Sequence, residues 1–203
     1  GQAGGGAAPT AEEAKKSKYL DRTILSSDDD EIIAVARQWN CDVPFIRPAE
    51  LAGDYATGIE PVLHALNMIN EKFDYVVLLQ PTSPLRVVDD IDECIEKCVS
   101  QNAPVCVTVT IPDKSPYWMY SLDDRGRLRP IIKQKNTILL RQQFKDVYAL
   151  NGAVYVAKID WFRKNRKFIS DKTIAHAMPK TRSIDIDTDW DLKICDVVLS
   201  ERK

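Results

Sequence analysis

Apolar and polar positions along the chain follow two periods, and together they predict strands that alternate with helices. Continuous apolar runs at 75–79 and 105–109 are typical of strands buried on both faces of a sheet. Shorter strands are expected at 23–26, 42–47 and 153–156. Helices are predicted where apolar residues recur at three- and four-residue spacing behind a capping residue: after Asp28, after Thr57, after Asp89 or Asp90, and from about 188 to 199. This alternation indicates parallel strands joined by helical crossovers, in a three-layer α/β sandwich.

Two segments depart from the alternation. Residues 1–18 open with a Gly- and Ala-rich stretch without apolar periodicity, and we expect a flexible or atypical lead there. Residues 19–203 then form a single domain, which a length of 203 residues allows. Within that domain, the stretch from about 117 to 148 is irregular and polar, so it is expected to form an inserted arm.

Composition narrows the function classes. The chain has 28 Lys and Arg against 30 Asp and Glu, a net charge of −2, which argues against a nucleic-acid or membrane-surface partner. No apolar run approaches the ~18 residues that cross a bilayer. The five cysteines are scattered among apolar neighbours and are interpreted as small buried side chains in a reducing compartment, hence in a cytoplasmic protein. Cys94 and Cys98 have a spacing that could suggest a metal, but no second Cys/His pair follows.

The first candidate site residue is Gln80, which closes the apolar run 75–79 and is followed by a loop held by Pro81 and Pro84. Ligands bind beyond the carboxyl ends of strands in open α/β sheets. A glutamine there presents amide donors and a carbonyl, which suit a base edge or a sugar hydroxyl. The alternative is a turn in which the backbone satisfies Gln80, and composition does not separate the two interpretations.

The second candidate is the run from Ser183 to Thr188. In an extended segment Asp185 and Asp187 project to one side, while Ile184 and Ile186 project into the core. Two carboxylates on one side repel each other unless a cation lies between them, and oxygen ligands suit Mg²⁺ that bridges to phosphates. Alternatively, these residues cap the last helix and are solvated; the alternation favours the metal.

The third candidate is a basic stretch within the arm, which carries no acidic residue. It could hold a phosphate or carboxylate, although such runs are usually solvated faces. The motifs for the usual forms of ATP hydrolysis, hydride transfer and serine hydrolysis are absent from the chain. The basic residues are Arg125, Arg127, Arg129, Lys133, Lys135, Arg141 and Lys145.

Five motifs occur in one order: SSDD from Ser26, FIRPAELA from Phe45, LQPTSPLR from Leu79, NGAVY from Asn151 and SIDID from Ser183. In this order the chain, from about residue 18 onward, resembles the acylneuraminate cytidylyltransferases. These are the CMP-sialic acid synthetases and their legionaminic and pseudaminic acid relatives. Five motifs in register are more specific than any one alone.

The resemblance implies a nucleotide-diphospho-sugar transferase fold, which is a Rossmann-like sandwich with a dimerisation arm, and hence a homodimer. It implies a reaction that joins CTP to a nine-carbon 2-keto sugar acid and releases pyrophosphate. It also implies roles for single residues: Arg47, Thr57 and Gln80 at the nucleotide, Gln80, Asn151, Tyr155 and Arg141 at the sugar, and Asp185 and Asp187 as the catalytic Mg²⁺ ligands. No general base is identifiable, and Asp185 or a metal-bound water are the candidates.

The chain departs from the family at its start. The family opens with a strand and a loop of the form A-R-x-G-S-K-G that cradles the CTP phosphates. Residues 1–14 instead hold three consecutive glycines and no arginine or Ser-Lys pair. Loss of this βα unit of about 30 residues would weaken or abolish CTP turnover, and would leave strand edges open to exchange with a partner chain.

Two alternatives to the leading hypothesis therefore stay open. One is a non-catalytic, dimeric nucleotide- or sugar-binding relic of the same fold. The other is a cytidylyltransferase for a different keto-sugar acid such as Kdo, which the acylneuraminate-like motifs make the weaker of the two. The leading hypothesis of nucleotide transfer requires that Gln80 and the paired aspartates face one pocket.

Overall fold

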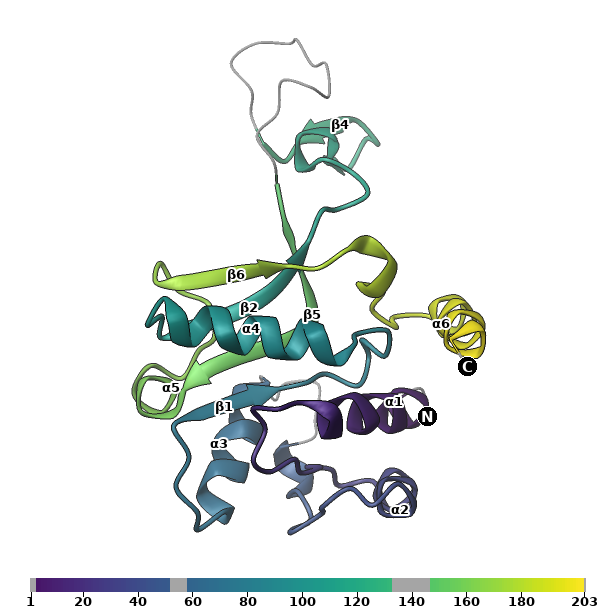
Figure 1. Ribbon diagram of the computed structural model, residues 1–203. Helices are drawn as coiled ribbons and strands as arrows, with labels where there is room; N and C mark the ends of the chain where they lie inside the picture. Colours follow the sequence, from purple (N-terminus) through teal and green to yellow (C-terminus); the bar gives the residue numbers. More distant parts are fainter. Residues whose placement is uncertain (1–2, 52–57, 133–146, 203) are drawn as a thin grey trace.

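A computed structural model describes residues 3–51, 58–132 and 147–202 of the chain (Figure 1). Its main sheet has four strands in the order β1-β5-β2-β6. Strand β5 runs antiparallel to both of its neighbours, whereas β2 and β6 are parallel. The strands are β1 (Tyr75–Leu78), β2 (Val105–Thr110), β5 (Ala149–Lys158) and β6 (Thr173–Ala177).

The α/β class is thus confirmed, but the expectation of parallel strands throughout is wrong for β5. The reason is the arm: the chain leaves the sheet at the end of β2 and returns from the arm to the same end (Figure 1). The returning strand β5 therefore pairs back onto β2 in the antiparallel direction, which needs no crossover helix.

Three layers are present, as predicted. Helix α4 (Val88–Ser100) covers one face of the sheet, and its Ile91 packs in one buried cluster with Cys106 and Val154. Helices α3 (Ile59–Met68) and α5 (Ile159–Asn165) supply side chains to a second cluster with Val105 and Val107. Neighbouring β2 residues enter opposite clusters because side chains alternate along a strand. The last helix, α6 (Asp189–Glu201), packs its buried Cys195 in a third, smaller cluster.

Where a flexible or atypical lead was expected over residues 1–18, the structure has helix α1 (Ala3–Lys16). The helix is anchored to the rest of the domain, since a Glu13 carboxylate oxygen accepts a hydrogen bond from the Val88 backbone N–H at 2.7 Å. Its buried positions include Ala7, Ala11 and Ala14. Alanines at this spacing form a helical face whose hydrophobicity is too weak to stand out in the sequence.

The N-terminal strand predictions were only partly correct. Where strands were expected at 23–26 and 42–47, the structure has one parallel bridge between Ile24 and Asp42. Helix α2 (Asp30–Gln38) lies between these segments, and its N-cap is Asp29, one residue later than predicted. Within the described chain, β1 pairs only with β5 and is an edge strand. Its residues are accordingly half-buried although the sequence suggested a fully buried strand.

The described part of the predicted arm projects away from the sheet (Figure 1). It contains a short 3₁₀ turn, Pro116–Trp118, and a hairpin of β3 (Tyr120–Leu122) and β4 (Leu128–Pro130). All six hairpin strand residues are exposed. Two further 3₁₀ turns, η1 (Ala49–Leu51) and η4 (Lys180–Arg182), complete the described elements that the functional argument uses.

Candidate active site

Gln80 lies directly beyond β1, in the loop that leads to α4. Its backbone carbonyl accepts hydrogen bonds from the Ser83 N–H at 3.2 Å and from both terminal nitrogens of Arg86, at 2.8 and 2.6 Å. Its side-chain oxygen lies 2.6 Å from the position that a Cβ on Gly152 would occupy. The loop therefore directs the Gln80 amide against the backbone of β5.

Gly152 is the point on which the candidate side chains converge. Its φ is +71°, a conformation that L-residues other than glycine rarely adopt. The same absent Cβ would lie 3.3 Å from the Ser83 hydroxyl oxygen and 3.6 Å from Asp185 Oδ2. Gln80, Ser83 and Asp185 thus surround one bare backbone position, and we refer to these four residues as the Gly152 cluster. The structure therefore brings Gln80 together with Asp185, whereas Asp187, the second of the paired aspartates, is exposed.

Asp185 reaches the cluster because its segment is fastened to the Gln80 loop. The backbone N–H of Ile186 donates to the Thr82 carbonyl at 2.8 Å, and the Ile186 side chain is buried in the third apolar cluster. Ile184 packs against the same cluster, so the predicted inward direction of both isoleucines is confirmed. Residues 183–187 form no regular strand, although the sequence predicted an extended segment there.

The two aspartates differ in their surroundings. Oxygen Oδ1 of Asp185 is buried and has no hydrogen-bond partner, whereas Asp187 is exposed. A buried carboxylate oxygen without a donor is costly, and a cation would satisfy it. The described residues contain no group of three or more His, Cys, Asp or Glu side chains suited to a metal. Asp185 nevertheless fits Mg²⁺, which is usually held by one or two carboxylates together with substrate phosphates and water.

Arg86 is the largest fully buried side chain of the described residues, and no role was predicted for it. Besides Gln80, its guanidinium donates to the Ala153 carbonyl at 3.0 Å and to the Thr10 hydroxyl at 2.7 Å. Burial lowers the pKa of Arg86 to about 10, against the opposing effect of nearby carboxylates, Asp90 first and then Asp185. The sequence signal that could have indicated a buried arginine is that Arg86 stands between two apolar residues, Leu85 and Val87.

Asn151 is buried, and its side chain is bonded within the protein at both ends. Its Oδ1 accepts from the Thr108 hydroxyl at 2.7 Å, and its Nδ2 donates to the Ser183 hydroxyl at 3.0 Å. Its backbone carbonyl accepts from the Ser83 hydroxyl at 3.1 Å. Asn151 therefore ties β2, the Gln80 loop and the Asp185 segment together, and its amide is not turned toward a ligand.

Tyr155 lies on β5, three residues beyond Gly152, and is half-buried against the ring of Phe168, with 5.3 Å between ring centroids. Burial raises the pKa of the Tyr155 hydroxyl, and the negative charge of Asp185 raises it further. The phenol therefore stays protonated near neutral pH, where it can donate a hydrogen bond.

Arg47 is bonded to the segment that precedes α2. Its backbone N–H donates to the Ser27 carbonyl at 2.9 Å, and its Nη2 donates to Asp28 Oδ1 at 2.5 Å. This hydrogen bond is the main cause of the lowered pKa of Asp28. Arg47 Nε is buried without a partner, so the side chain keeps one unused donor. Thr57 and Arg141, the remaining predicted site residues, lie outside the described residues.

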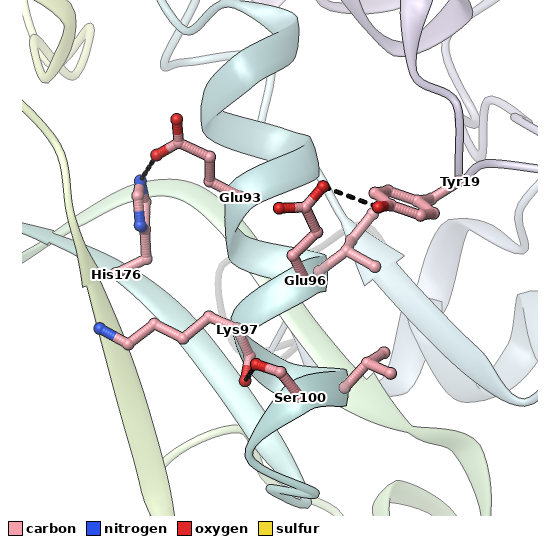
Figure 2. A pocket seen from close by; sticks show the side chains of 8 residues that line it. Tyr19, Glu93, Glu96, Lys97, Ser100 and His176 are labelled. Atoms are coloured by element: carbon pink, nitrogen blue, oxygen red, sulfur yellow. Dashed lines mark hydrogen bonds and ion pairs between the residues drawn. The ribbon is translucent and has the colours of Figure 1, made fainter.

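A separate hollow of about 700 Å³ lies along the second half of α4 (Figure 2). Its polar side chains are already paired: Tyr19 donates to Glu96 at 2.7 Å, and His176 faces Glu93 at 3.5 Å. In the view of Figure 2 the His176–Glu93 pair lies to the left of the helix and the Tyr19–Glu96 pair to its right. The hollow is therefore a surface formed around α4, and it contains none of the Gly152 cluster.

The fold defines the class of protein. The structure resembles CMP:2-keto-3-deoxy-manno-octonic acid synthetase complexed with CTP, with a TM-score of 0.69 over 96% of this chain and 87% of that one, at 10% identity. It also resembles 4-diphosphocytidyl-2C-methyl-D-erythritol synthase from Anaerococcus prevotii, with a TM-score of 0.63, 13% identity, and coverage of 96% and 86%. The fold is thus that of the nucleotidyltransferases.

The sequence identifies the family within this class. The family profile described as cytidylyltransferase matches residues 9–136, and the chain belongs to that family. It is 33% identical over 186 residues to the CMP-N,N'-diacetyllegionaminic acid synthase of Legionella pneumophila, covering 88% of this chain and 79% of that protein. It is 25% identical to the pseudaminic acid cytidylyltransferase of Campylobacter jejuni, covering 92% and 82%. It is 28% identical to the N-acylneuraminate cytidylyltransferase of Escherichia coli, covering 96% of this chain and 45% of that longer protein. No described helix is long and apolar enough to cross a membrane.

Proposed function

We propose that this chain transfers CMP from CTP to a sialic-acid-like nine-carbon 2-keto sugar acid and releases pyrophosphate. The observation that carries the proposal is the Gly152 cluster, in which Gln80, Ser83 and Asp185 meet on one glycine backbone. Membership of the cytidylyltransferase family supports the nucleotide, and the names of the relatives support the class of sugar acid.

In this proposal the chain's own residues bind and orient the two substrates. Gln80 offers both amide donors and a carbonyl to a base edge or a sugar hydroxyl, while Arg86 fixes its backbone. Tyr155 donates a hydrogen bond toward the sugar. Asn151, which was expected at the sugar, acts by holding the surrounding segments in place.

Asp185 and Asp187 would hold a divalent cation, and we infer Mg²⁺ because both ligands are carboxylates. The support is the buried, unpartnered Asp185 oxygen. When bound, the cation supplies positive charge that stabilises the phosphates of CTP and the departing pyrophosphate. Asp185 also remains a candidate base for the anomeric hydroxyl.

The remaining roles extend beyond the Gly152 cluster. Arg47 and Thr57 would bind the nucleotide, and the unused Arg47 donor supports the first of these. Arg141 would reach the sugar site from the arm of a partner subunit. All five cysteines are free thiols, which supports a reducing compartment and hence a cytoplasmic enzyme.

A homodimer through the arm is part of the same proposal. The described arm exposes large apolar side chains beyond what a solvated hairpin needs, and a second copy would cover them. The exposed apolar residues of this region include Trp118, Met119, Tyr120, Leu122, Leu128 and Ile131.

Pyrophosphate release tests the proposal. The assay contains CTP, Mg²⁺ and either N-acetylneuraminic, legionaminic or pseudaminic acid, with wild type compared with Asp185→Asn. We expect turnover with one of these acids and a loss of at least about 100-fold in the variant, because charge stabilisation at the phosphates is removed. Asp113→Asn is the matched control, since Asp113 is exposed and pairs with Lys180. Saturable CTP binding without any turnover would instead indicate a non-catalytic binding module.

A further inference from the structure

Asp90, in the first turn of α4, is a buried carboxylate that the proposed reaction does not use. It is 1% exposed. Its Oδ2 accepts from the Val87 backbone N–H at 3.0 Å, which caps the helix. The same carboxylate accepts two hydrogen bonds from Arg182, from Nε at 2.9 Å and from Nη2 at 2.7 Å. Such a forked pair fixes the direction of the guanidinium as well as its distance.

Arg182 stands three residues before Asp185, at the end of η4. The short span that follows it is fastened at two further points: Ser183 accepts a hydrogen bond from Asn151, and the Ile186 N–H donates to Thr82. Asp185 lies between these attachments, and its buried Oδ1 has no protein partner. The position of that carboxylate therefore depends on the attachments and not on contacts of its own.

Arg86, two residues before α4, and Asp90, in the first turn of α4, thus hold the two sides of the Gly152 cluster. Arg86 holds the Gln80 carbonyl, and Asp90 holds Arg182 and the segment that carries Asp185. Both side chains are buried and make several hydrogen bonds, so together they restrain the spacing between Gln80 and Asp185.

We propose that the Asp90–Arg182 ion pair positions the Asp185 carboxylate and thereby sets the affinity of the site for a divalent cation. The inference rests on the proposed metal role of Asp185. Both members are positioning residues, since neither is a proposed ligand of the cation and Arg182 donates to Asp90. Replacement of a residue that orients a metal ligand without binding the metal itself typically weakens metal affinity by about 10- to 100-fold.

The test uses Arg182→Lys, which keeps the charge opposite Asp90 but cannot form the fork. Complete removal of the arginine would leave Asp90 buried and unpaired and could unfold the protein, so the lysine variant is preferred. The matched control is Lys180→Gln: Lys180 lies in the same turn, and its ion pair with Asp113 at 2.7 Å is exposed and involves no residue of the cluster.

Mn²⁺ binding to the whole chain is measured from the electron paramagnetic resonance signal of the free ion, alongside the melting temperature. For Arg182→Lys we expect the Kd for Mn²⁺ to rise about tenfold, while Lys180→Gln stays near wild type. With substrates present, the Mg²⁺ concentration for half-maximal pyrophosphate release should rise by a similar factor, with little change in kcat at saturating Mg²⁺.

The inference is wrong if Arg182→Lys lowers the melting temperature but binds Mn²⁺ as tightly as the Lys180→Gln control. Asp185→Asn separates this outcome from failure of the proposed function. If that variant also retains wild-type Mn²⁺ binding, the metal role of Asp185 fails and the inference fails with it. If Asp185→Asn loses Mn²⁺ and Arg182→Lys does not, only the positioning role is refuted.

Discussion

The Gly152 cluster and the arm differ in how their side chains are stabilised. Around the cluster, the buried polar side chains of Arg86, Asp90 and Asn151 are bonded to several segments of the same chain. In the arm, the hairpin β3–β4 exposes apolar residues such as Leu122 and Leu128. A buried polar network fixes a geometry within one chain, whereas an exposed apolar hairpin gains stability only when a second surface covers it.

The largest effect in this comparison is expected from Arg86→Met. The variant removes a buried guanidinium and the hydrogen bonds that it donates to the Gln80 and Ala153 carbonyls, so that Gln80 keeps only its bond from the Ser83 N–H. The free energy of unfolding should fall by about 3 kcal/mol, measured by urea denaturation. In the arm, Arg129→Met removes an exposed pair with Asp123 and should leave the denaturation midpoint nearly unchanged. Equal losses in the two variants would contradict the contrast.

Two glycines allow the contrast to be tested at equal backbone strain. Gly152 has φ +71° and Gly126, in the arm turn, has φ +73°. A Cβ on Gly152 would meet the Gln80 oxygen at 2.6 Å, whereas nothing lies within 4 Å of one on Gly126. Gly152→Ala should lower kcat/KM about 100-fold by displacing Gln80.

Gly126→Ala should retain full activity at a modest cost in stability, because only the backbone conformation is strained. Pyrophosphate release and thermal unfolding are measured for both variants. Similar activity in both variants would show that turnover does not depend on the position of the Gln80 side chain against Gly152.

The arm is tested by replacing its exposed apolar side chains. Leu122→Ser with Leu128→Ser should raise the dimer dissociation constant tenfold or more, since apolar contacts contribute most to such interfaces. The unfolding of the monomer should change little, because both side chains are more than 60% exposed. Sedimentation velocity over a concentration series measures this. A wild type that stays monomeric at micromolar concentration would refute the proposed arm interface.

The smallest effect concerns two aspartates with lowered pKa values. For Asp28 the main cause is the side chain of Arg47, whereas for Asp123 it is the backbone N–H of Arg127. Since the folded pKa of Asp28 lies below its ordinary value of 3.8, the stabilisation is present above that pH and is lost as the pH falls through the folded pKa.

Arg47→Met should therefore move the pKa of Asp28 back toward 3.8, and Arg129→Met should leave most of the Asp123 shift in place. Carboxyl carbon chemical shifts followed against pH report both values. An unchanged Asp28 pKa in Arg47→Met would show that the pair is not formed in solution.

The sequence predicted those elements whose signals are local. The apolar runs of β1 and β2 and the periodic faces of α3, α4 and α6 each lie within one segment and were located from it. The direction of β5 depends on the path by which the chain returns from the arm. The burial of α1 depends on alanines, whose weak hydrophobicity marks a buried face only when the neighbouring segments are known. Neither of these follows from periodicity.

In the candidate site, too, residues with a local sequence signal were predicted and residues without one were missed. Gln80 was predicted because it follows an apolar run at a position where ligands bind, and Asp185 because it alternates with Ile184 and Ile186. Asp90 was expected only as a possible helix cap, and its pairing with Arg182 and the contacts of Arg86 with Ala153 and Thr10 were missed because these partners are distant in sequence. Arg182 and Asp90, for example, are 92 residues apart. Asn151 was found as a motif residue, but only the structure showed that both ends of its amide are occupied.

The central claim is that Gln80 and Asp185 belong to one cation-dependent site. Mn²⁺ broadens NMR signals of nuclei close to it, so the side-chain amide signals of Gln80 can report on the ion directly. We predict that substoichiometric Mn²⁺ broadens the Gln80 amide in the wild type and leaves it sharp in Asp185→Asn. A Gln80 signal that stays sharp in the wild type, while residues around Glu93 and His176 broaden instead, would contradict the account.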